Sequence, residues 1–439
     1  MKKIVRGIVM MLACLLFFGQ AAEAKTELEK NGALKVSGTQ LVSQKTGKKV
    51  QLRGVSTHGI NWDVGYPYIS KDAFKTLRDD YGVNAIRLAM YTTEYYGYCD
   101  KAGAWESQSE VQKVLKTRIH TGVQAATDLG MYVIIDWHVL NDQNPNKYKK
   151  EAKAFFKEMS KKYASYDNVL YEICNEPNGG TQWSDIKNYA KEVIPVIREN
   201  DKDAVVIVGT PTWSQDVDIV SQSPLDSSYG NVMYTLHFYS ATHKDWYRQK
   251  LETAYKNGLP VMVTEFGVSE ASGSGQMDTN EAQTWLNTLD KKGISYFAWS
   301  LSNKPETASL LASGTSKKSG WKTSDLSPAG KWILGKYKQK AGIKFSAVTN
   351  LSIKNKKGKV IYVTFSKKKD AAGYEIAVST SSKFAKGKTK TIKTTKNTYT
   401  VKKCKKNQMY YVRVRAYKKV NGKKVYSNYS AKKKIKIAK

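Results

Sequence analysis

Two glutamates stand at the ends of apolar runs that are typical of buried β-strands. Glu176 follows the run that begins at Val169, and Glu265 ends the run that begins at Pro260. Runs that are apolar throughout are typical of parallel sheets, where a carboxylate is costly to bury. Two carboxylates at the carboxyl ends of barrel strands can act as acid and nucleophile on a glycosidic bond. The pair therefore predicts a site for glycoside hydrolysis.

Further polar and aromatic residues end or lie within the other apolar runs of the chain. They are His58, Arg87, His138, Asn175, His237, Tyr239 and Trp299. One strand-end histidine or amide alone is more often structural than catalytic. Because the catalytic residues of a barrel gather where its strands end, the agreement of the whole set favours one shared site.

The side-chain chemistry of this set suggests separate roles. Arg87 is a natural partner to hold Glu265 ionised, and Tyr239 can donate a hydrogen bond to the same carboxylate. Asn175 directly precedes Glu176 and can bond a sugar 2-hydroxyl as the transition state forms. These roles require the two carboxyl groups to have pKa values that differ.

Histidines and tryptophans complete the predicted site. His138 and His237 can orient the acid and the sugar. Indole rings offer flat apolar faces to sugar rings, and the candidates are Trp62, Trp213 and Trp299.

The elements that must position these residues alternate along the first three quarters of the chain. Eight apolar runs span residues 52–59, 85–91, 131–138, 169–175, 204–209, 232–239, 260–265 and 294–300. Stretches with apolar residues at helical spacing span 111–129, 151–163, 183–199 and 280–292. Eight strands alternating with helices predict an α/β fold, the (β/α)8 or TIM barrel. A doubly wound open sheet is disfavoured, because polar residues follow most strands rather than one switch point.

The last hundred residues have a different composition. Residues 341–439 hold 29 basic and two acidic residues, whereas residues 1–340 hold 43 basic and 36 acidic ones. Runs at 359–365, 373–379, 397–401 and 408–417 alternate with period two, which predicts a β-sandwich. This segment resembles a fibronectin type III domain, with Tyr410 or Tyr411 as the candidate for its tyrosine corner.

The N-terminus predicts export. Lys2, Lys3 and Arg6 precede an apolar run over residues 8–18, and Ala22-Glu-Ala24 is a small-residue cleavage signal. We expect a signal peptide over residues 1–24, a catalytic domain over 25–340 and a Lys-rich sandwich over 341–439. Because we expect a secreted, extracellular protein, nucleic acid is disfavoured as the partner of the basic domain. Anionic cell-wall polymers or membrane surfaces are favoured, and a solvated spacer without a partner stays open.

Three cysteines remain after the predicted cleavage site, which is too few for a disulfide framework. Cys174 lies in a predicted core strand and is expected to be a buried apolar residue. Whether Cys99 pairs with another thiol stays open, and so does the state of Cys404.

Six segments together resemble the motifs of glycoside hydrolase family 5, and most closely its bacterial endo-β-1,4-glucanases. They are Thr57-His-Gly-Ile60, Ile134-Ile-Asp-Trp-His138, Tyr171-Glu-Ile-Cys-Asn-Glu-Pro-Asn178, Tyr234-Thr-Leu-His-Phe-Tyr239, Val263-Thr-Glu-Phe-Gly267 and Trp299-Ser-Leu-Ser-Asn-Lys304. The resemblance covers about residues 33–337. It implies a secreted cellulase that retains anomeric configuration and binds β-1,4-glucan. It implies neither metal nor cofactor, and we expect a monomer.

Carried over by position, the resemblance makes Glu176 the general acid/base and Glu265 the nucleophile. Its supporting residues are Arg87, His138, Asn175, His237, Tyr239 and Trp299. Its sugar-binding positions on the non-reducing side of the cleavage point are His58, Trp62, Tyr91, Lys304 and Glu306. Phe266 and Asn303 depart from a common Trp and a common Asp of the family, which leaves the subsite preference in doubt.

Three alternatives stay open at this stage. A β-mannanase or a mixed-linkage β-glucanase would share the same catalytic residues. A metal-dependent hydrolase would use Asp136, His138, His237 and His243, although their spacing is not a usual ligand spacing. A non-catalytic carbohydrate-binding or wall-binding protein is conceivable for the tail alone, which contains no tryptophan.

Overall fold

The computed structural model describes residues 25–341, 347–368, 371–420 and 423–438. The predicted signal peptide lies outside these residues. The chain divides into two compact units, one holding a barrel and the other a β-sandwich. Residues 76–83 and the helix from Gly330 onward group with the second unit. The domain limits predicted from composition therefore stay a prediction.

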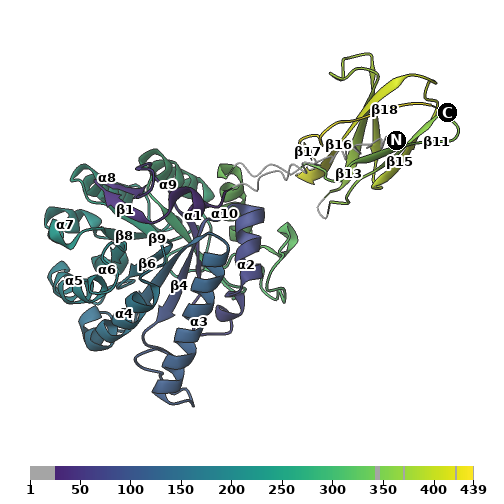
Figure 1. Ribbon diagram of the computed structural model, residues 1–439. Coiled ribbons are helices and arrows are strands. Elements are labelled where there is room, and N and C mark those ends of the chain that lie inside the picture. The colour runs from purple at the N-terminus through teal and green to yellow at the C-terminus, as the bar shows by residue number, and fades with distance from the viewer. Residues whose placement is uncertain (1–24, 342–346, 369–370, 421–422, 439) are drawn as a thin grey trace, which may run out of the picture. The chain divides into compact units, whose positions relative to one another are not determined.

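Eight parallel strands close into a barrel in the order β10-β3-β4-β5-β6-β7-β8-β9, as Figure 1 shows in part. Their bounds are β3 Arg53–Thr57, β4 Ala85–Tyr91, β5 Tyr132–His138, β6 Val169–Glu172, β7 Val206–Val208, β8 Val232–Tyr239, β9 Val261–Gly267 and β10 Tyr296–Leu301. Nearly every residue of these strands is buried, because the barrel fills its interior while helices cover its outside. The predicted TIM barrel is confirmed.

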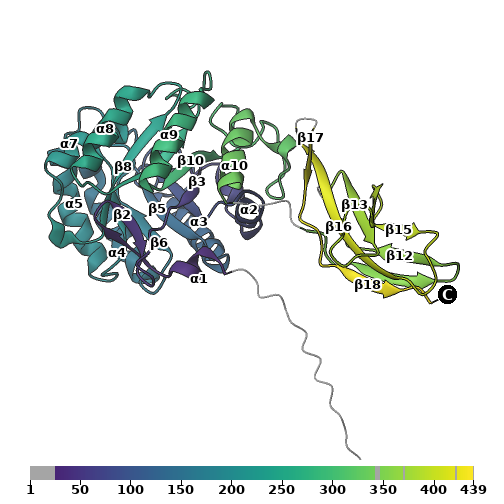
Figure 2. The same cartoon turned by 90° about the horizontal axis from the view of Figure 1, so that it is seen from above.

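The helices lie outside the strands, as the two views of Figures 1 and 2 agree. The α-helices are α1 Glu27–Asn31, α2 Lys71–Thr76, α3 Gln108–Asp128, α4 Lys149–Tyr163, α5 Trp183–Arg198, α6 Pro211–Ser214, α7 Val217–Gln222, α8 Asp245–Lys256, α9 Thr279–Lys292 and α10 Pro328–Lys340. Short helical turns are η1 Tyr66–Tyr68, η2 Leu77–Tyr81, η3 Pro145–Tyr148, η4 Ser227–Tyr229 and η5 Thr323–Asp325. Helix α3 begins at a capping box formed by Ser107 and Glu110, which satisfies two backbone donors.

A short hairpin precedes the barrel and was not predicted from the sequence. Strands β1 (Leu34–Ser37) and β2 (Gln40–Ser43) pair antiparallel. Leu34 and Leu41 are buried in one cluster with Leu52 and Phe297 of the barrel. The hairpin thus covers one end of the barrel interior.

The C-terminal unit contains two antiparallel sheets. One has the order β11-β12-β15, and the other has the order β14-β13-β16-β17 with β18 beside β16. The bounds are β11 Ser352–Lys356, β12 Val360–Thr364, β13 Gly373–Ser379, β14 Thr389–Thr394, β15 Thr398–Val401, β16 Met409–Val420, β17 Lys423–Tyr426 and β18 Lys433–Lys436. Side chains from both sheets, among them Ile361, Val363, Ile376 and Val414, form one buried core. The predicted sandwich is confirmed.

The tyrosine corner is formed by Tyr410. Its hydroxyl accepts a hydrogen bond of 3.0 Å from the backbone N–H of Lys405. This bond ties strand β16 to the turn before it, as in fibronectin type III domains.

The cysteines at 99, 174 and 404 are free thiols, and Cys174 is fully buried as expected. Among the described residues, no helix combines the length and apolarity needed to cross a bilayer.

Candidate active site

A cavity of about 560 Å³ lies at the carboxyl ends of the barrel strands. Twelve of the predicted site residues line it: His58, Trp62, Tyr91, His138, Glu176, Trp213, His237, Tyr239, Glu265, Trp299, Lys304 and Glu306. The other two, Arg87 and Asn175, are fully buried and bond to each other and to the lining residues. The barrel therefore brings the whole predicted set together.

The two glutamates occupy different backbone settings, which corrects the expectation that both end a strand. Strand β6 ends at Glu172, so Glu176 lies in the loop after it, whereas Glu265 lies within β9. The loop is held by a bond from the Glu176 N–H to the carbonyl of Val139. Gly209 allows this path, because a Cβ there would lie 2.4 Å from the carbonyl oxygen of Cys174.

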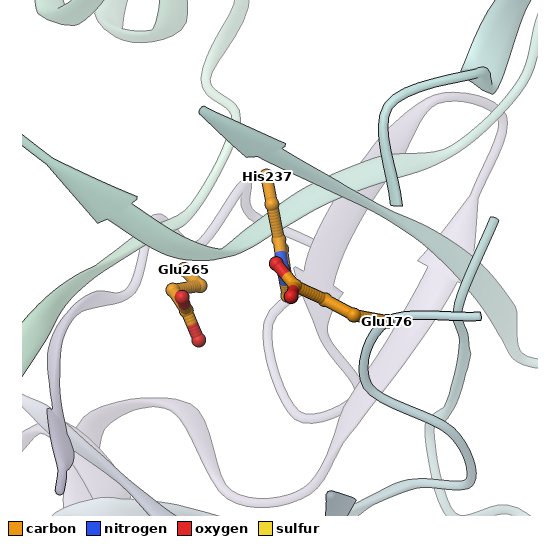
Figure 3. Close-up of side chains that lie close together, drawn as sticks. All are labelled: Glu176, His237 and Glu265. Carbon is orange, nitrogen blue, oxygen red and sulfur yellow. The ribbon is translucent and has the colours of Figure 1, made fainter. Parts of the chain in front are cut away.

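The two carboxylates face each other across the cavity with His237 beside them (Figure 3). One oxygen of Glu176, one oxygen of Glu265 and a ring nitrogen of His237 all lie within 4.8 Å of one another. Carboxyl groups about 5–5.5 Å apart are typical of retaining glycosidases, whereas inverting enzymes need a wider separation for a water molecule.

Arg87 binds three carboxylates below the cavity floor. Its Nε lies 2.7 Å from Glu172, one terminal nitrogen lies 3.1 Å from Asp136, and the other lies 3.1 Å from Glu265. It also donates to Asn175 at 2.6 Å. Burial opposes its charge, but these carboxylates outweigh burial and raise its pKa, so the guanidinium stays charged.

Glu265 is buried but supplied with donors. Burial, helped by the nearby Glu176, raises its pKa to about 7. Arg87 and the Tyr239 hydroxyl, which donates to Glu265 at 2.6 Å, act in the opposite direction and favour the carboxylate form. This environment is suited to an ionised nucleophile.

Glu176 has fewer partners that stabilise its charge. Burial raises its pKa to about 8, and Arg87 lowers it only in part. Its carboxyl group contacts His237 Nδ1 at 2.8 Å. Glu265 accepts from Arg87 and Tyr239, whereas Glu176 has neither donor, so the hydrogen-bond geometry favours the ionised form of Glu265 and the protonated form of Glu176.

His138 links Asp136 to Asn175 by hydrogen bonds beside Glu176. His138 Nδ1 lies 2.6 Å from Asp136, and its Nε2 lies 3.2 Å from the amide nitrogen of Asn175. The Asn175 oxygen accepts from Arg87, so the amide nitrogen is the donor to His138. His138 therefore carries its proton on Nδ1 and donates it to Asp136, and burial lowers its pKa well below the usual value.

One side of the cavity combines a charged pair with aromatic rings. Lys304 lies 2.6 Å from Glu306, and His58 lies 3.7 Å from the other oxygen of that carboxylate. The ring of Trp62 packs 4.4 Å from Tyr91, centroid to centroid, and its indole N–H donates to the carbonyl of Tyr95. This wall offers both hydrogen bonds and apolar faces to a sugar.

Trp213 lines the cavity from α6, the short helix after β7, and is 46% exposed. Its backbone is left-handed, with φ of 55°, and its N–H bonds to the carbonyl of Pro177. The loop that carries Glu176 therefore holds the backbone of Trp213.

Sequence reasoning missed several residues of the site. Glu172 and Thr264 bond to each other at 2.7 Å below the cavity. Others line it, namely Glu94, Leu140, Gln215 and residues 271–273, together with His243, which the sequence suggested only as a metal ligand. The available signal for Glu172 and Thr264 was their polarity inside apolar runs, four residues before Glu176 and one before Glu265.

The four residues of the metal alternative do not come together as a ligand cluster among the described residues. Asp136 and His138 bond to each other, and His243 Nδ1 accepts from the backbone N–H of Tyr239. In the part of the chain that the structure describes, Glu176, His237 and Glu265 form the one cluster with ligand-like spacing. Both ring nitrogens of His237 are already within bonding distance of other groups, Glu176 and Thr264.

Comparison with known families agrees with this geometry. Residues 43–305 match the model of the cellulase family, glycosyl hydrolase family 5, and residues 346–432 match that of the fibronectin type III domain. An endoglucanase of Clostridium saccharobutylicum is 46% identical over 328 residues, which cover 74% of this chain and 70% of that protein. Endoglucanase A of Butyrivibrio fibrisolvens is 48% identical over 315 residues, covering 71% and 70%.

Solved structures agree as well. The catalytic domain of an endoglucanase from Thermobifida fusca, in complex with cellotetraose, is 35% identical with a TM-score of 0.65, covering 72% of this chain and all of that domain. The chain is a glycoside hydrolase that belongs to family 5, the cellulase family, and carries a fibronectin type III domain after the barrel.

Proposed function

We propose that the protein is a retaining endo-β-1,4-glucanase that hydrolyses internal bonds of cellulose and related β-glucans. The main support is the geometry of Glu176 and Glu265. One oxygen of each carboxyl group lies within 4.8 Å of the other, and the two groups have different hydrogen-bond partners. This separation is suited to direct attack by one carboxylate rather than by water.

In the first step, Glu265 forms a bond to the anomeric carbon as the glycosidic C–O bond breaks. Glu176 gives its proton to the leaving oxygen, so the departing chain leaves as a neutral alcohol. In the second step, Glu176 takes a proton from water while the water oxygen attacks the anomeric carbon and releases Glu265. Two inversions give net retention.

Several observations support glucan as the substrate. The relatives described above are named endoglucanases, and one solved relative holds cellotetraose. The cavity wall formed by His58, Trp62, Lys304 and Glu306 combines ring faces with hydroxyl-binding groups. Trp213 and Lys304 are about half exposed at the rim of the cavity. Such an open rim is suited to binding a polymer chain at an internal position.

Azide rescue would test the two roles separately. With an activated aryl cellobioside, azide should rescue Glu176→Ala and give the β-glycosyl azide, because the covalent intermediate still forms. Azide should rescue Glu265→Ala through direct attack and give the α-glycosyl azide. Glu158→Gln, an exposed carboxylate on α4, is the matched control and should behave as wild type. Products of swapped configuration would overturn the assignment.

A β-mannanase or mixed-linkage β-glucanase remains the second candidate, because it would use the same carboxylates. Initial rates on carboxymethyl cellulose, barley β-glucan and galactomannan distinguish the candidates. The proposal requires carboxymethyl cellulose to be cleaved, with rapid loss of viscosity. Cleavage of galactomannan alone would keep the mechanism and overturn the substrate.

We further propose that the enzyme is secreted as a monomer after removal of residues 1–24. The support is the sequence of the leader, and N-terminal sequencing of protein from the culture medium tests it. Lys25 as the first residue is the expected result, and light scattering should give the mass of one chain.

The basic domain is proposed to hold the enzyme on anionic cell-wall polymers. Support comes from its 29 basic residues against two acidic ones. Retention on purified wall material should fall as salt rises, since exposed charges are screened over about 8 Å at physiological ionic strength.

A further inference from the structure

A chain of hydrogen bonds joins the buried ion pair of the barrel to the proposed acid. Thr264 Oγ lies 2.7 Å from Glu172 and 2.8 Å from His237 Nε2. His237 Nδ1 lies 2.8 Å from Glu176. The side chains of Glu172, Thr264 and His237 are buried, so these bonds are shielded from bulk water.

The direction of the first bond is set by Glu172. Both of its oxygens already accept from Arg87, whose Nε lies at 2.7 Å and whose terminal nitrogen lies at 3.3 Å. A carboxylate held by a guanidinium fork only accepts hydrogen bonds. The single hydroxyl proton of Thr264 therefore points to Glu172.

The direction of the second bond follows from the first. Thr264 has used its proton, so its oxygen can only accept from His237, and the proton of the neutral imidazole lies on Nε2. Thr235 also contacts the Thr264 oxygen and acts there as a donor. Nδ1 of His237 is then unprotonated and can only accept a hydrogen bond.

The third bond fixes the state of Glu176. A carboxylate oxygen and a bare nitrogen both lack a proton and would repel each other at 2.8 Å. We infer that Thr264 is a positioning residue that fixes the Nε2–H tautomer of His237 and thereby keeps Glu176 protonated in the free enzyme. This inference rests on the proposed role of Glu176 as the general acid.

The electrostatic surroundings agree with a neutral His237–Glu176 pair. Burial lowers the pKa of His237 to about 4, whereas burial raises that of Glu176 to about 8. The charged and titratable groups facing the pair are Arg87 and Tyr91 on β4, Asp136 and His138 on β5, Glu172 on β6, Tyr239 on β8 and Glu265 on β9. Proton transfer from Glu176 to His237 is thus disfavoured.

The same arrangement serves the second chemical step. Once Glu176 has protonated the leaving oxygen, its carboxylate faces the Nδ1 lone pair. This contact is unfavourable and increases the basicity of Glu176, which must then take a proton from water. Thr264 would therefore support both steps without touching the substrate.

Nitrogen NMR of the full chain labelled with ¹⁵N-histidine tests the tautomer directly in the wild-type protein. The chain has five histidines, so the His237 signals can be assigned by their loss in His237→Gln. Near pH 6 the expected result is a protonated, pyrrole-type Nε2 and a bare, pyridine-type Nδ1. A protonated Nδ1 in the wild type would overturn the inference.

The pH profile of Thr264→Val tests the consequence. Valine has the shape of threonine but offers no oxygen to Nε2, so the Nδ1–H tautomer can donate to an ionised Glu176. The pKa of Glu176 should fall, and the basic limb of kcat/KM on cello-oligosaccharides should move down by roughly one pH unit. Thr264→Ser should return the limb to its wild-type position.

Thr235→Val is the matched control. It removes a donor to the Thr264 oxygen and an acceptor of the Thr264 backbone N–H, but the Thr264 hydroxyl still donates to Glu172. Its basic limb should stay within a few tenths of a unit of wild type. A Thr264→Val enzyme that loses rate with an unmoved limb would overturn the inference. If that variant does not fold, the wild-type NMR result still decides.

A second substrate separates this inference from the proposed function. An aryl cellobioside with a dinitrophenolate leaving group needs no proton from the enzyme. Thr264→Val should therefore have the wild-type kcat/KM on this substrate but a reduced kcat/KM on cello-oligosaccharides. Loss on both substrates would mean that Thr264 only supports the fold. Full activity of the Glu176→Gln variant on cello-oligosaccharides would instead refute the proposed function.

Discussion

The barrel and the sandwich each contain an arginine bound to a glutamate, and the two pairs differ in burial. Arg87 is fully buried and contacts Glu172, Asp136 and Glu265. Arg415 on β16 is 29% exposed, contacts Glu375 on β13 at 2.7 Å, and its guanidinium lies over the ring of Tyr426.

The difference shows what burial does to charge. In the barrel, water cannot screen the carboxylates, so pKa values move into the range where proton transfer is useful. In the sandwich, Arg415 and the Tyr426 hydroxyl lower the pKa of Glu375 despite its burial, and the group stays ionised. The same residue types therefore provide chemistry in one region and local stability in the other.

Removing the carboxyl charge should separate the two regions most strongly. Glu265→Gln should reduce kcat by at least about 10³-fold, because the nucleophile is lost. Glu375→Gln should leave kcat on carboxymethyl cellulose unchanged, since it lies in the other unit. Reducing-sugar assays on both purified variants check this pair, and a Glu265→Gln enzyme with a tenth of wild-type activity would contradict it.

Removing each arginine compares the cost of leaving carboxylates without their cation. Arg87→Met should lower the free energy of unfolding by about 3–5 kcal/mol, because buried carboxylates lose their partner. Arg415→Met should cost about 1 kcal/mol or less, since the pair is partly solvated. Urea unfolding followed by tryptophan fluorescence reports the barrel, and far-ultraviolet circular dichroism reports both units. Equal losses would show that burial does not distinguish the two pairs.

Two tyrosines form a third matched comparison. Tyr239 donates to Glu265 at 2.6 Å, and Tyr426 donates to Glu375 at 3.0 Å. The bond from Tyr239 lowers the pKa of Glu265, so Tyr239→Phe should raise it further. The nucleophile is ionised above its pKa, and the acidic limb of kcat/KM should therefore move to higher pH by roughly one unit. Tyr426→Phe should leave the pH profile unmoved.

The smallest effect concerns exposed lysines of the sandwich. Replacing Lys393, Lys424 and Lys434 by Gln should change stability by no more than about 0.5 kcal/mol each and leave kcat unchanged. It should weaken retention on anionic wall material and flatten its salt dependence. A sedimentation assay over a range of NaCl concentrations measures both, and unchanged retention would contradict a role for these charges.

The sequence predicted the barrel because its strands are continuous apolar runs. Strands β4 and β8 begin and end at the predicted residues, since both faces of each are buried. Elements with few buried residues escaped prediction. Helix α8 buries Leu251 and Ala254 alone, and strand β14 buries Ile392 alone, so neither carries a clear period.

The candidate site was predictable in its members but not in its connections. Strand-end position identified Glu176, Glu265 and the residues around them, because a parallel barrel gathers the ends of its strands. Glu172 and Thr264 lie inside the predicted apolar runs and could not be distinguished there from ordinary polar residues. Their bond joins positions 92 residues apart and exists only because β6 and β9 face the same barrel interior.

The sequence by itself determined the fold class, the basic tail and the identity of the two carboxylates, because apolar periodicity and residue type are local properties. The tertiary structure decided how each carboxyl group is surrounded, and the proposed proton on Glu176 rests on those surroundings. That outcome depends on Arg87, Tyr239, Thr264 and His237, which come from three strands and act through burial and hydrogen-bond direction. Neither property exists until the barrel closes.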